Sequence, residues 1–166
     1  MKKWIFFIAC IIGVANVFAQ SDTPAFKKFP VVPQLQLLQV DSSTFTKDNL
    51  KKHQPLIIMY FSPSCEHCKH QWEDMTKNMA DLKKYQILMV TYQPFEEMVD
   101  FYKTQHVAQY SNIKLARDTK FVLPPFYRIQ SLPYMALYDK KGNLVTTFEG
   151  NVKIDKMLKA FNSKSK

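Results

Sequence analysis

Two cysteines three positions apart are the residues of this chain best suited to chemistry. Cys65 and Cys68 enclose Glu66 and His67 in a Cys-x-x-Cys motif. Thiols at this spacing can close and reopen a disulfide, which moves two electrons from or to another thiol pair. The loop that they close is too small to restrict the unfolded chain much, so a purely structural cross-link is a poor explanation. We therefore expect these cysteines to perform redox chemistry.

The sequence around the motif predicts different roles for the two cysteines. Residues 55–61 form an apolar run typical of a strand buried on both faces, residues 62–64 interrupt it, and a helical pattern begins at Cys65. The unpaired N–H groups and the positive dipole end of a first helical turn favour a thiolate there. Cys65 is therefore the predicted nucleophile, and Cys68, one turn further on, is the predicted resolving thiol.

The two residues between the cysteines should tune the thiol pKa values in opposite directions. An imidazole donor on His67 stabilises a neighbouring thiolate, whereas the negative charge of Glu66 disfavours a second one. The sequence gives no net sign for this effect, so it leaves the direction of electron flow open.

The first residues predict export. Lys2 and Lys3 precede an almost wholly apolar stretch at residues 4–14, and residues 17–19 suit a signal peptidase. This pattern predicts a signal peptide over residues 1–19, cut after Ala19, although an uncleaved anchor is the alternative. The apolar stretch is shorter than the roughly 20 residues that span a membrane, so no stable membrane insertion is expected after cleavage. We expect a periplasmic or otherwise extracytoplasmic protein.

The composition indicates one globular domain with an uninformative positive charge. The 166 residues are 46% hydrophobic and 22% charged, with a formal net charge of +9. Arg117 and Arg128 are the two arginines, whereas proteins that bind nucleic acid favour arginine over lysine. The scattered lysines indicate a solvated surface, so no nucleic-acid partner is expected.

Strand and helix patterns alternate along the chain and predict an α/β fold. We expect strands at 35–40, 55–61, 85–92, 113–116, 134–138 and 144–148, and helices at 44–53, 65–82, 95–102 and 154–161. The early strands should be parallel and joined by helical crossovers, and the last two antiparallel. The predicted architecture is a mixed central sheet with helices on both faces, over residues 35–162. An irregular lead-in at 20–34 precedes it, and a Lys-rich tail at 163–166 follows.

Residues 60–69 (YFSPSCEHCK) resemble the active-site stretch of the thioredoxin superfamily, and Ser131-Leu132-Pro133 resembles its cis-proline loop. The long separation of Cys65 from Pro133, together with the signal peptide, is similar to the exported TlpA/ResA-like branch. The resemblance implies a thioredoxin-like fold and a thiol-disulfide oxidoreductase that acts on client proteins with thiols or disulfides. It also implies that Leu132 and Pro133 hold the client backbone, that a redox partner protein is needed, and that no cofactor is needed.

Two departures from the family pattern bear on the direction of electron flow. Thioredoxin has a buried aspartate at the position of Met59, and a histidine at the place of His67 occurs in the oxidising relatives. Both departures weaken the interpretation as a reductase.

Two other functions fit the same motif. A metal or haem-apoprotein handling protein would use the cysteines as ligands, but zinc needs two more, and His53, His67, His70 and His106 form no second pair. A thiol peroxidase would need an arginine that supports the peroxide, and both arginines are distant in sequence. We predict no metal site.

Aromatic residues near the proline loop have two interpretations. Phe121, Phe126, Tyr127 and Tyr134 could line a substrate groove or pack in the core. Core packing is favoured, because aromatic side chains are mostly buried.

Overall fold

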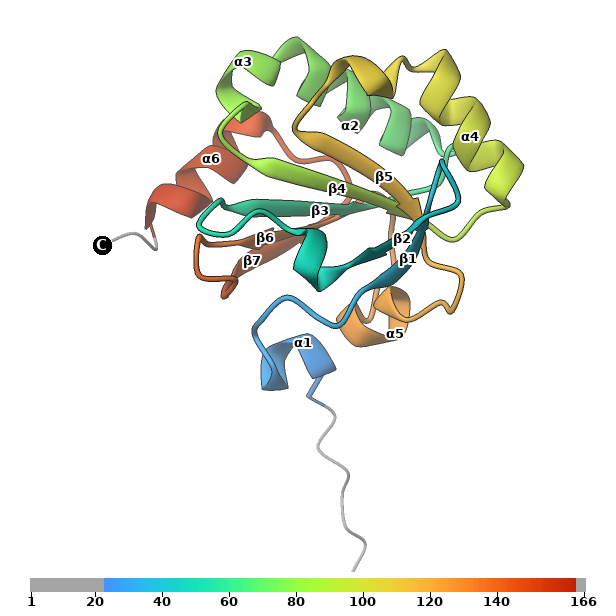
Figure 1. Cartoon of the computed structure of the whole chain (residues 1–166). Coiled ribbons are helices and arrows are strands. Elements are labelled where there is room, and N and C mark those ends of the chain that lie inside the picture. Colours follow the sequence, from blue (N-terminus) through green and yellow to red (C-terminus); the bar gives the residue numbers. More distant parts are fainter. Residues whose placement is uncertain (1–22, 164–166) are drawn as a thin grey trace, which may run out of the picture.

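A seven-stranded mixed sheet forms the centre of the protein in a computed structural model, which describes residues 23–163. The strand order is β2-β1-β5-β4-β3-β6-β7 (Figure 1). Strands β3, β4 and β5 are parallel, and the other pairs are antiparallel. The predicted signal peptide and most of the predicted tail lie outside the described residues.

The elements follow one another in a fixed order along the chain. The strands are β1 (Gln36–Gln39), β2 (Thr44–Thr46), β3 (Leu56–Tyr60), β4 (Gln86–Thr91), β5 (Ile113–Arg117), β6 (Tyr134–Tyr138) and β7 (Leu144–Glu149). The helices are α1 (Ala25–Lys28), α2 (Glu66–Lys77), α3 (Met79–Leu82), α4 (Phe95–Thr104), α5 (Leu123–Tyr127) and α6 (Ile154–Ser163), with 3-10 turns at Lys47–Asn49 and Val107–Gln109. Within residues 23–163, no helix is long and apolar enough to cross a membrane.

Helices cover both faces of the sheet, as predicted. Helices α2, α3, α4 and α6 lie on one face, and α1 and α5 lie on the other (Figure 1). Strand β3 supplies both cores: Ile57 and Met59 pack under α2 and α4, and Ile58 packs on the α5 side. Every residue of β3 is buried, which explains its continuous apolar sequence.

The helix predicted at residues 44–53 is wrong. Thr44–Thr46 forms strand β2, and a 3-10 turn follows at Lys47–Asn49. The β-branched residues Thr44 and Thr46 flank Phe45, which is buried opposite Leu37. The side-chain oxygen of Asn49 accepts the N–H of Thr46 at 2.7 Å, which closes the turn.

The predicted parallel direction of the first strand is also wrong. Strand β1 is antiparallel to β2 and to β5. The physical reason is the connection: a tight hairpin replaces the expected helix after β1, and a hairpin reverses the chain. The parallel part of the sheet is therefore limited to β3, β4 and β5.

Candidate active site

Cys65 lies at the start of α2, where the sequence placed it. It is the N-cap residue, with an extended backbone (φ −83°, ψ 117°). Its N–H donates to the carbonyl of Ser62 at 3.1 Å, and its own carbonyl accepts the N–H of Lys69 at 3.0 Å. The four residues 61–64 after β3 thus bring Cys65 to the first turn of the helix. Cys65 is half-buried, and it packs against the core cluster that contains Cys68.

Cys68 lies inside the first turn of α2 and is buried, with 1% of its surface exposed. Burial, and after it a hydrogen bond with the Cys65 side chain, raise the pKa of the Cys68 thiol to about 12. A backbone hydrogen bond from Ser62 acts in the opposite direction. Both cysteines are unpaired thiols here, and Cys68 is the one held in its protonated form.

Glu66 and His67 both point away from the core. The Glu66 carboxylate accepts a hydrogen bond from Lys69 Nζ at 2.6 Å. This bond and the charge of Lys69 lower the pKa of Glu66. The Lys69 ammonium therefore compensates the negative charge that Glu66 places next to Cys65. His67 is exposed. Its backbone carbonyl accepts a hydrogen bond from the side-chain amide of Asn151 at 2.7 Å.

The Leu132-Pro133 loop lies at the same edge of the sheet as Cys65. Strands β3 and β6 are antiparallel with Tyr60 opposite Tyr134, so the residues just after Tyr60 and just before Tyr134 meet at one edge. The Leu132–Pro133 peptide bond is cis. Pro133 is buried, and Leu132 packs against the core cluster that contains Cys68. The structure thus brings together the two segments on which the resemblance rests.

A three-residue segment at residues 150–152 joins this loop to α2. The N–H of Gly150 donates to the Pro133 carbonyl at 2.9 Å. Val152 exchanges two hydrogen bonds with the fully buried side chain of Gln71: its N–H donates to Gln71 Oε1 at 2.7 Å, and its carbonyl accepts from Gln71 Nε2 at 3.1 Å. Sequence reasoning missed Gln71. The available signal was a polar residue on the buried face of α2, beside Trp72.

A polar network supports the turn before Cys65. The Ser62 hydroxyl is buried and lies 3.0 Å from the Ser64 hydroxyl. Gln93 Nε2 donates to Ser62 Oγ at 3.2 Å, and Arg117 Nε donates to the Gln93 carbonyl at 2.6 Å. These residues come from the ends of β3, β4 and β5, so the parallel part of the sheet holds the turn in place.

Some of the aromatic residues near the proline loop pack in the core, and one of them is exposed. Tyr127 and Tyr134 are buried, as core packing predicts. Phe121 is 53% exposed, and its ring meets the edge of the Tyr92 ring at 5.5 Å between centroids. Tyr92 in turn stacks on Tyr60 at 6.3 Å. Exposed aromatic surface therefore lies at the sheet edge that follows β4 and β5.

In the part of the chain from residue 23 to 163, no three His, Cys, Asp or Glu side chains form a group that could hold a metal ion.

A dithiol at the start of the helix that follows the central strand, beside a proline loop on a mixed sheet, defines the thioredoxin class of folds. The chain belongs to the thioredoxin-like domain family, whose model matches residues 44–164. The resemblance to the thioredoxin superfamily is therefore confirmed. A comparison with curated protein sequences gave no significant match.

Solved structures share this fold at low sequence identity. The exposed lipoprotein thioredoxin Etrx1 of Streptococcus pneumoniae strain TIGR4 is 22% identical, with a TM-score of 0.62 over 79% of this chain and 99% of that one. StoA of Bacillus subtilis is 18% identical, with a TM-score of 0.60 over 79% and 98%. A secreted Mycobacterium tuberculosis disulfide oxidoreductase homologous to E. coli DsbE is 14% identical, with a TM-score of 0.63 over 78% and 96%.

Proposed function

We propose that this protein is an exported thiol-disulfide oxidoreductase that exchanges electrons with client proteins through Cys65 and Cys68. The difference between the two thiols carries the proposal. Cys65 is half-buried at the cap of α2, whereas Cys68 is buried with its pKa raised to about 12. The thiolate is the attacking species, so this difference supports Cys65 as the thiol of the first step and Cys68 as the thiol of the second.

The reaction is a pair of thiol-disulfide exchanges. The Cys65 thiolate attacks one sulfur of a client disulfide, the client S–S bond breaks, and the leaving client thiolate takes up a proton. Cys68 then loses its proton and attacks the Cys65 sulfur, which releases the second client thiol. The client gains two electrons, and the protein is left with a Cys65–Cys68 disulfide. The same steps in reverse oxidise a client dithiol.

Two features prepare Cys68 for the second step. Cys65 packs against the core cluster that contains Cys68, and its side chain is one cause of the raised pKa of Cys68, so the two thiols are close neighbours. The raised pKa of Cys68 disfavours its direct attack on a client disulfide, which leaves the first step to Cys65. Glu66 with its partner Lys69, and His67, adjust the charge beside the reacting sulfur.

The Leu132-Pro133 loop is the proposed place for the client backbone. It lies at the sheet edge where Cys65 is half-buried, and residues 150–152 tie it to α2. A client segment with its reacting cysteine over Cys65 would extend along this loop. A redox partner protein must then return the cysteine pair to its starting state after each turnover.

The extracytoplasmic location rests on the predicted signal peptide. Two proteins of similar structure support it, because one is an exposed lipoprotein and the other is secreted. StoA and the DsbE homologue likewise support a place in the exported TlpA/ResA-like branch.

Trapping of mixed disulfides tests the proposal. Cys68→Ser should accumulate mixed disulfides with clients in an extracytoplasmic extract, detected on non-reducing gels, because the second step is lost. Cys65→Ser should accumulate few, and the variant with both substitutions sets the background. Equal trapping by the two single variants would refute the assigned roles. The reduction potential of the pair, compared with about −270 mV for a reductant and about −120 mV for an oxidant, gives the direction of electron flow.

A further inference from the structure

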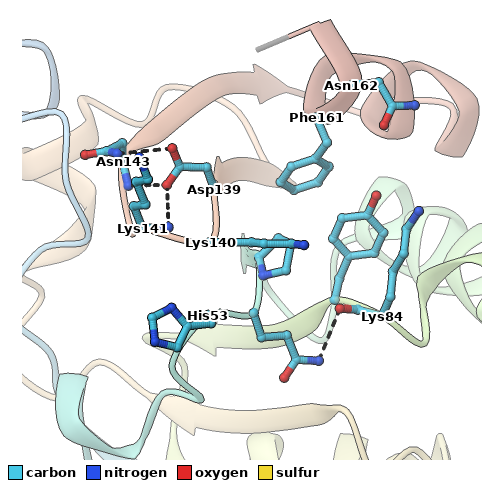
Figure 2. Close-up of a pocket in the computed structure, with 11 residues that line it drawn as sticks. His53, Lys84, Asp139, Lys140, Lys141, Asn143, Phe161 and Asn162 are labelled. Carbon is cyan, nitrogen blue, oxygen red and sulfur yellow. Dashed lines mark hydrogen bonds between the residues drawn. The ribbon is translucent and has the colours of Figure 1, made fainter. Parts of the chain in front are cut away.

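We propose that a hollow at the end of the sheet opposite the cysteines binds a small, multiply charged anion that carries phosphate groups. The hollow has a volume of about 700 Å³, which is the size of a small-molecule site (Figure 2). Pro55, just before β3, lines it, whereas Cys65 follows the other end of that strand. The hollow is therefore separate from the active site and independent of the proposed redox function.

Lysine side chains from two separate turns, and a histidine from a third, converge on this hollow. His53 comes from the turn before β3, Lys84 from the turn between α3 and β4, and Lys140 and Lys141 from the turn between β6 and β7. Figure 2 shows Lys140 extending across the hollow, with His53 on one side and Lys84 on the other. The folded chain thus concentrates charges that are far apart in sequence, and such concentration raises the local potential for an anion.

One carboxylate lines the hollow, and it is already engaged. Asp139 accepts the backbone N–H groups of Lys141 at 2.8 Å and Asn143 at 2.9 Å, and also the Asn143 side-chain amide at 3.1 Å. These bonds hold its oxygens against the β6–β7 turn (Figure 2). The lysines that form ion pairs with glutamates, Lys69 and Lys77, lie on α2 instead.

Aromatic rings and side-chain amides also line the hollow. The rings of Tyr85 and Phe161 lie 4.6 Å apart and form one wall, and Lys84 Nζ lies 5.3 Å from the Tyr85 ring. Gln54 Nε2 donates to the Lys84 carbonyl at 3.2 Å, which fixes the turn that carries Lys84. Asn162 adds an amide at the rim. Ammonium and amide donors suit the oxygens of phosphate.

A neighbouring hollow extends the positive lining. It has a volume of about 440 Å³, shares His53, Lys140 and Lys141 with the first, and adds Lys51 and Lys52. Several lysines around concave spaces favour a ligand with two or more phosphate groups over a single phosphate. Concavity also favours a small ligand over a flat bilayer surface.

Calorimetric titration with inorganic pyrophosphate at low ionic strength tests the site. The purified protein should bind one pyrophosphate, and bind it more tightly than inorganic monophosphate. Lys84→Glu and Lys140→Glu should each weaken binding at least tenfold. Lys103→Glu on α4 makes the same change in net charge outside the hollow, and it should alter binding less than twofold. Circular dichroism establishes that each variant is folded.

Three results would overturn the proposal. The first is no saturable binding of pyrophosphate, and the second is an equal loss in the Lys103→Glu control, which would reflect net charge alone. The third is binding to vesicles with anionic phosphatidylglycerol that depends on Lys140 while pyrophosphate fails to bind, because that would make the hollow part of a membrane-binding surface. Mixed-disulfide trapping by Cys68→Ser should be unchanged when Lys140→Glu is added, so failure of the anion site and failure of the redox function can be distinguished.

Discussion

The side chain of Gln71 and the backbone of Val152 are joined by two hydrogen bonds across a sequence separation of 81 residues. Gln71 is fully buried in α2, and Val152 follows the end of β7. The pair therefore fixes the position of the helix that carries Cys68 relative to the chain segment beside Pro133. The Gln71 amide satisfies both the N–H and the carbonyl of Val152, which would otherwise be buried without partners.

Replacing Gln71 by leucine should lower the free energy of unfolding by roughly 2–4 kcal/mol, because two backbone groups lose their partners in a buried place. Urea denaturation followed by circular dichroism measures the change. Gln109→Leu, at an exposed position, should change it by less than about 0.5 kcal/mol. A loss in Gln71→Leu no larger than in this control would show that the two bonds contribute little.

Alkylation should separate the two thiols by their dependence on pH. Because the pKa of Cys68 is about 12, its thiolate fraction is very small at neutral pH and rises about tenfold with each pH unit up to that value. In the folded protein, iodoacetamide should therefore modify Cys65 near neutral pH and leave Cys68 unmodified. Peptide mapping by mass spectrometry measures both rates. In guanidinium chloride the two rates should be similar, and similar rates in the folded protein would contradict the assignment.

Removing the Lys69 ammonium should leave the negative charge of Glu66 uncompensated, and this charge should slow the alkylation of Cys65. Lys69→Met deletes the ammonium that pairs with Glu66 at 2.6 Å, so the alkylation rate of Cys65 should fall a few-fold at low salt. Glu66→Gln should raise it. Glu73→Gln breaks the Lys77 pair two turns along α2 and provides the matched control. The differences should shrink in about 1 M salt, where the Debye length is about 3 Å. Equal rates in all variants would remove Glu66 from the tuning groups.

At position 121, a glycine variant should be more stable than an alanine variant. Its φ is 52°, in the left-handed region that is strained for residues with a Cβ atom, and its side chain is 53% exposed. Phe121→Gly should therefore be more stable than Phe121→Ala by about 1 kcal/mol. Glu97, on the exposed side of α4, should show the opposite order, with glycine less stable by about 0.5–1 kcal/mol. Thermal unfolding compares the four variants, and the same order at both positions would argue against strain at Phe121.

The central elements were predictable because their apolar patterns are unambiguous. The run before Cys65 became β3, the run at residues 85–92 became β4, and helix α2 begins at Glu66 with Cys65 as its N-cap, one residue from the predicted start. The register between β3 and β6 then brings Pro133 to the edge where Cys65 lies, so the two sequence motifs were enough to predict the proximity of their segments.

Other features depend on contacts that a local pattern does not contain. Acidic, basic and capping residues at 44–53 suggested a helix, but burial of Phe45 against Leu37 favours a strand, and that burial requires the partner strand. Gln71 bonds backbone atoms far along the chain, so its side-chain type alone gave no partner. The basic hollow takes lysines from separate turns, and each of these turns looks like an ordinary solvated surface in the sequence.

The position of β3 also sets an order in time. β3 pairs with β4 on one side and with β6 on the other, and β6 comes much later in the chain. In a chain that crosses a membrane from its N-terminus, β3 and the helix with both cysteines would arrive while the partner strand β6 and the Pro133 loop are still behind. One edge of β3 would then lack its partner strand, and the two thiols would enter the new compartment before β6 and the Pro133 loop. If the proposed export holds, the cysteine pair would be most exposed to wrong disulfides in this interval, before β6 and the Pro133 loop arrive.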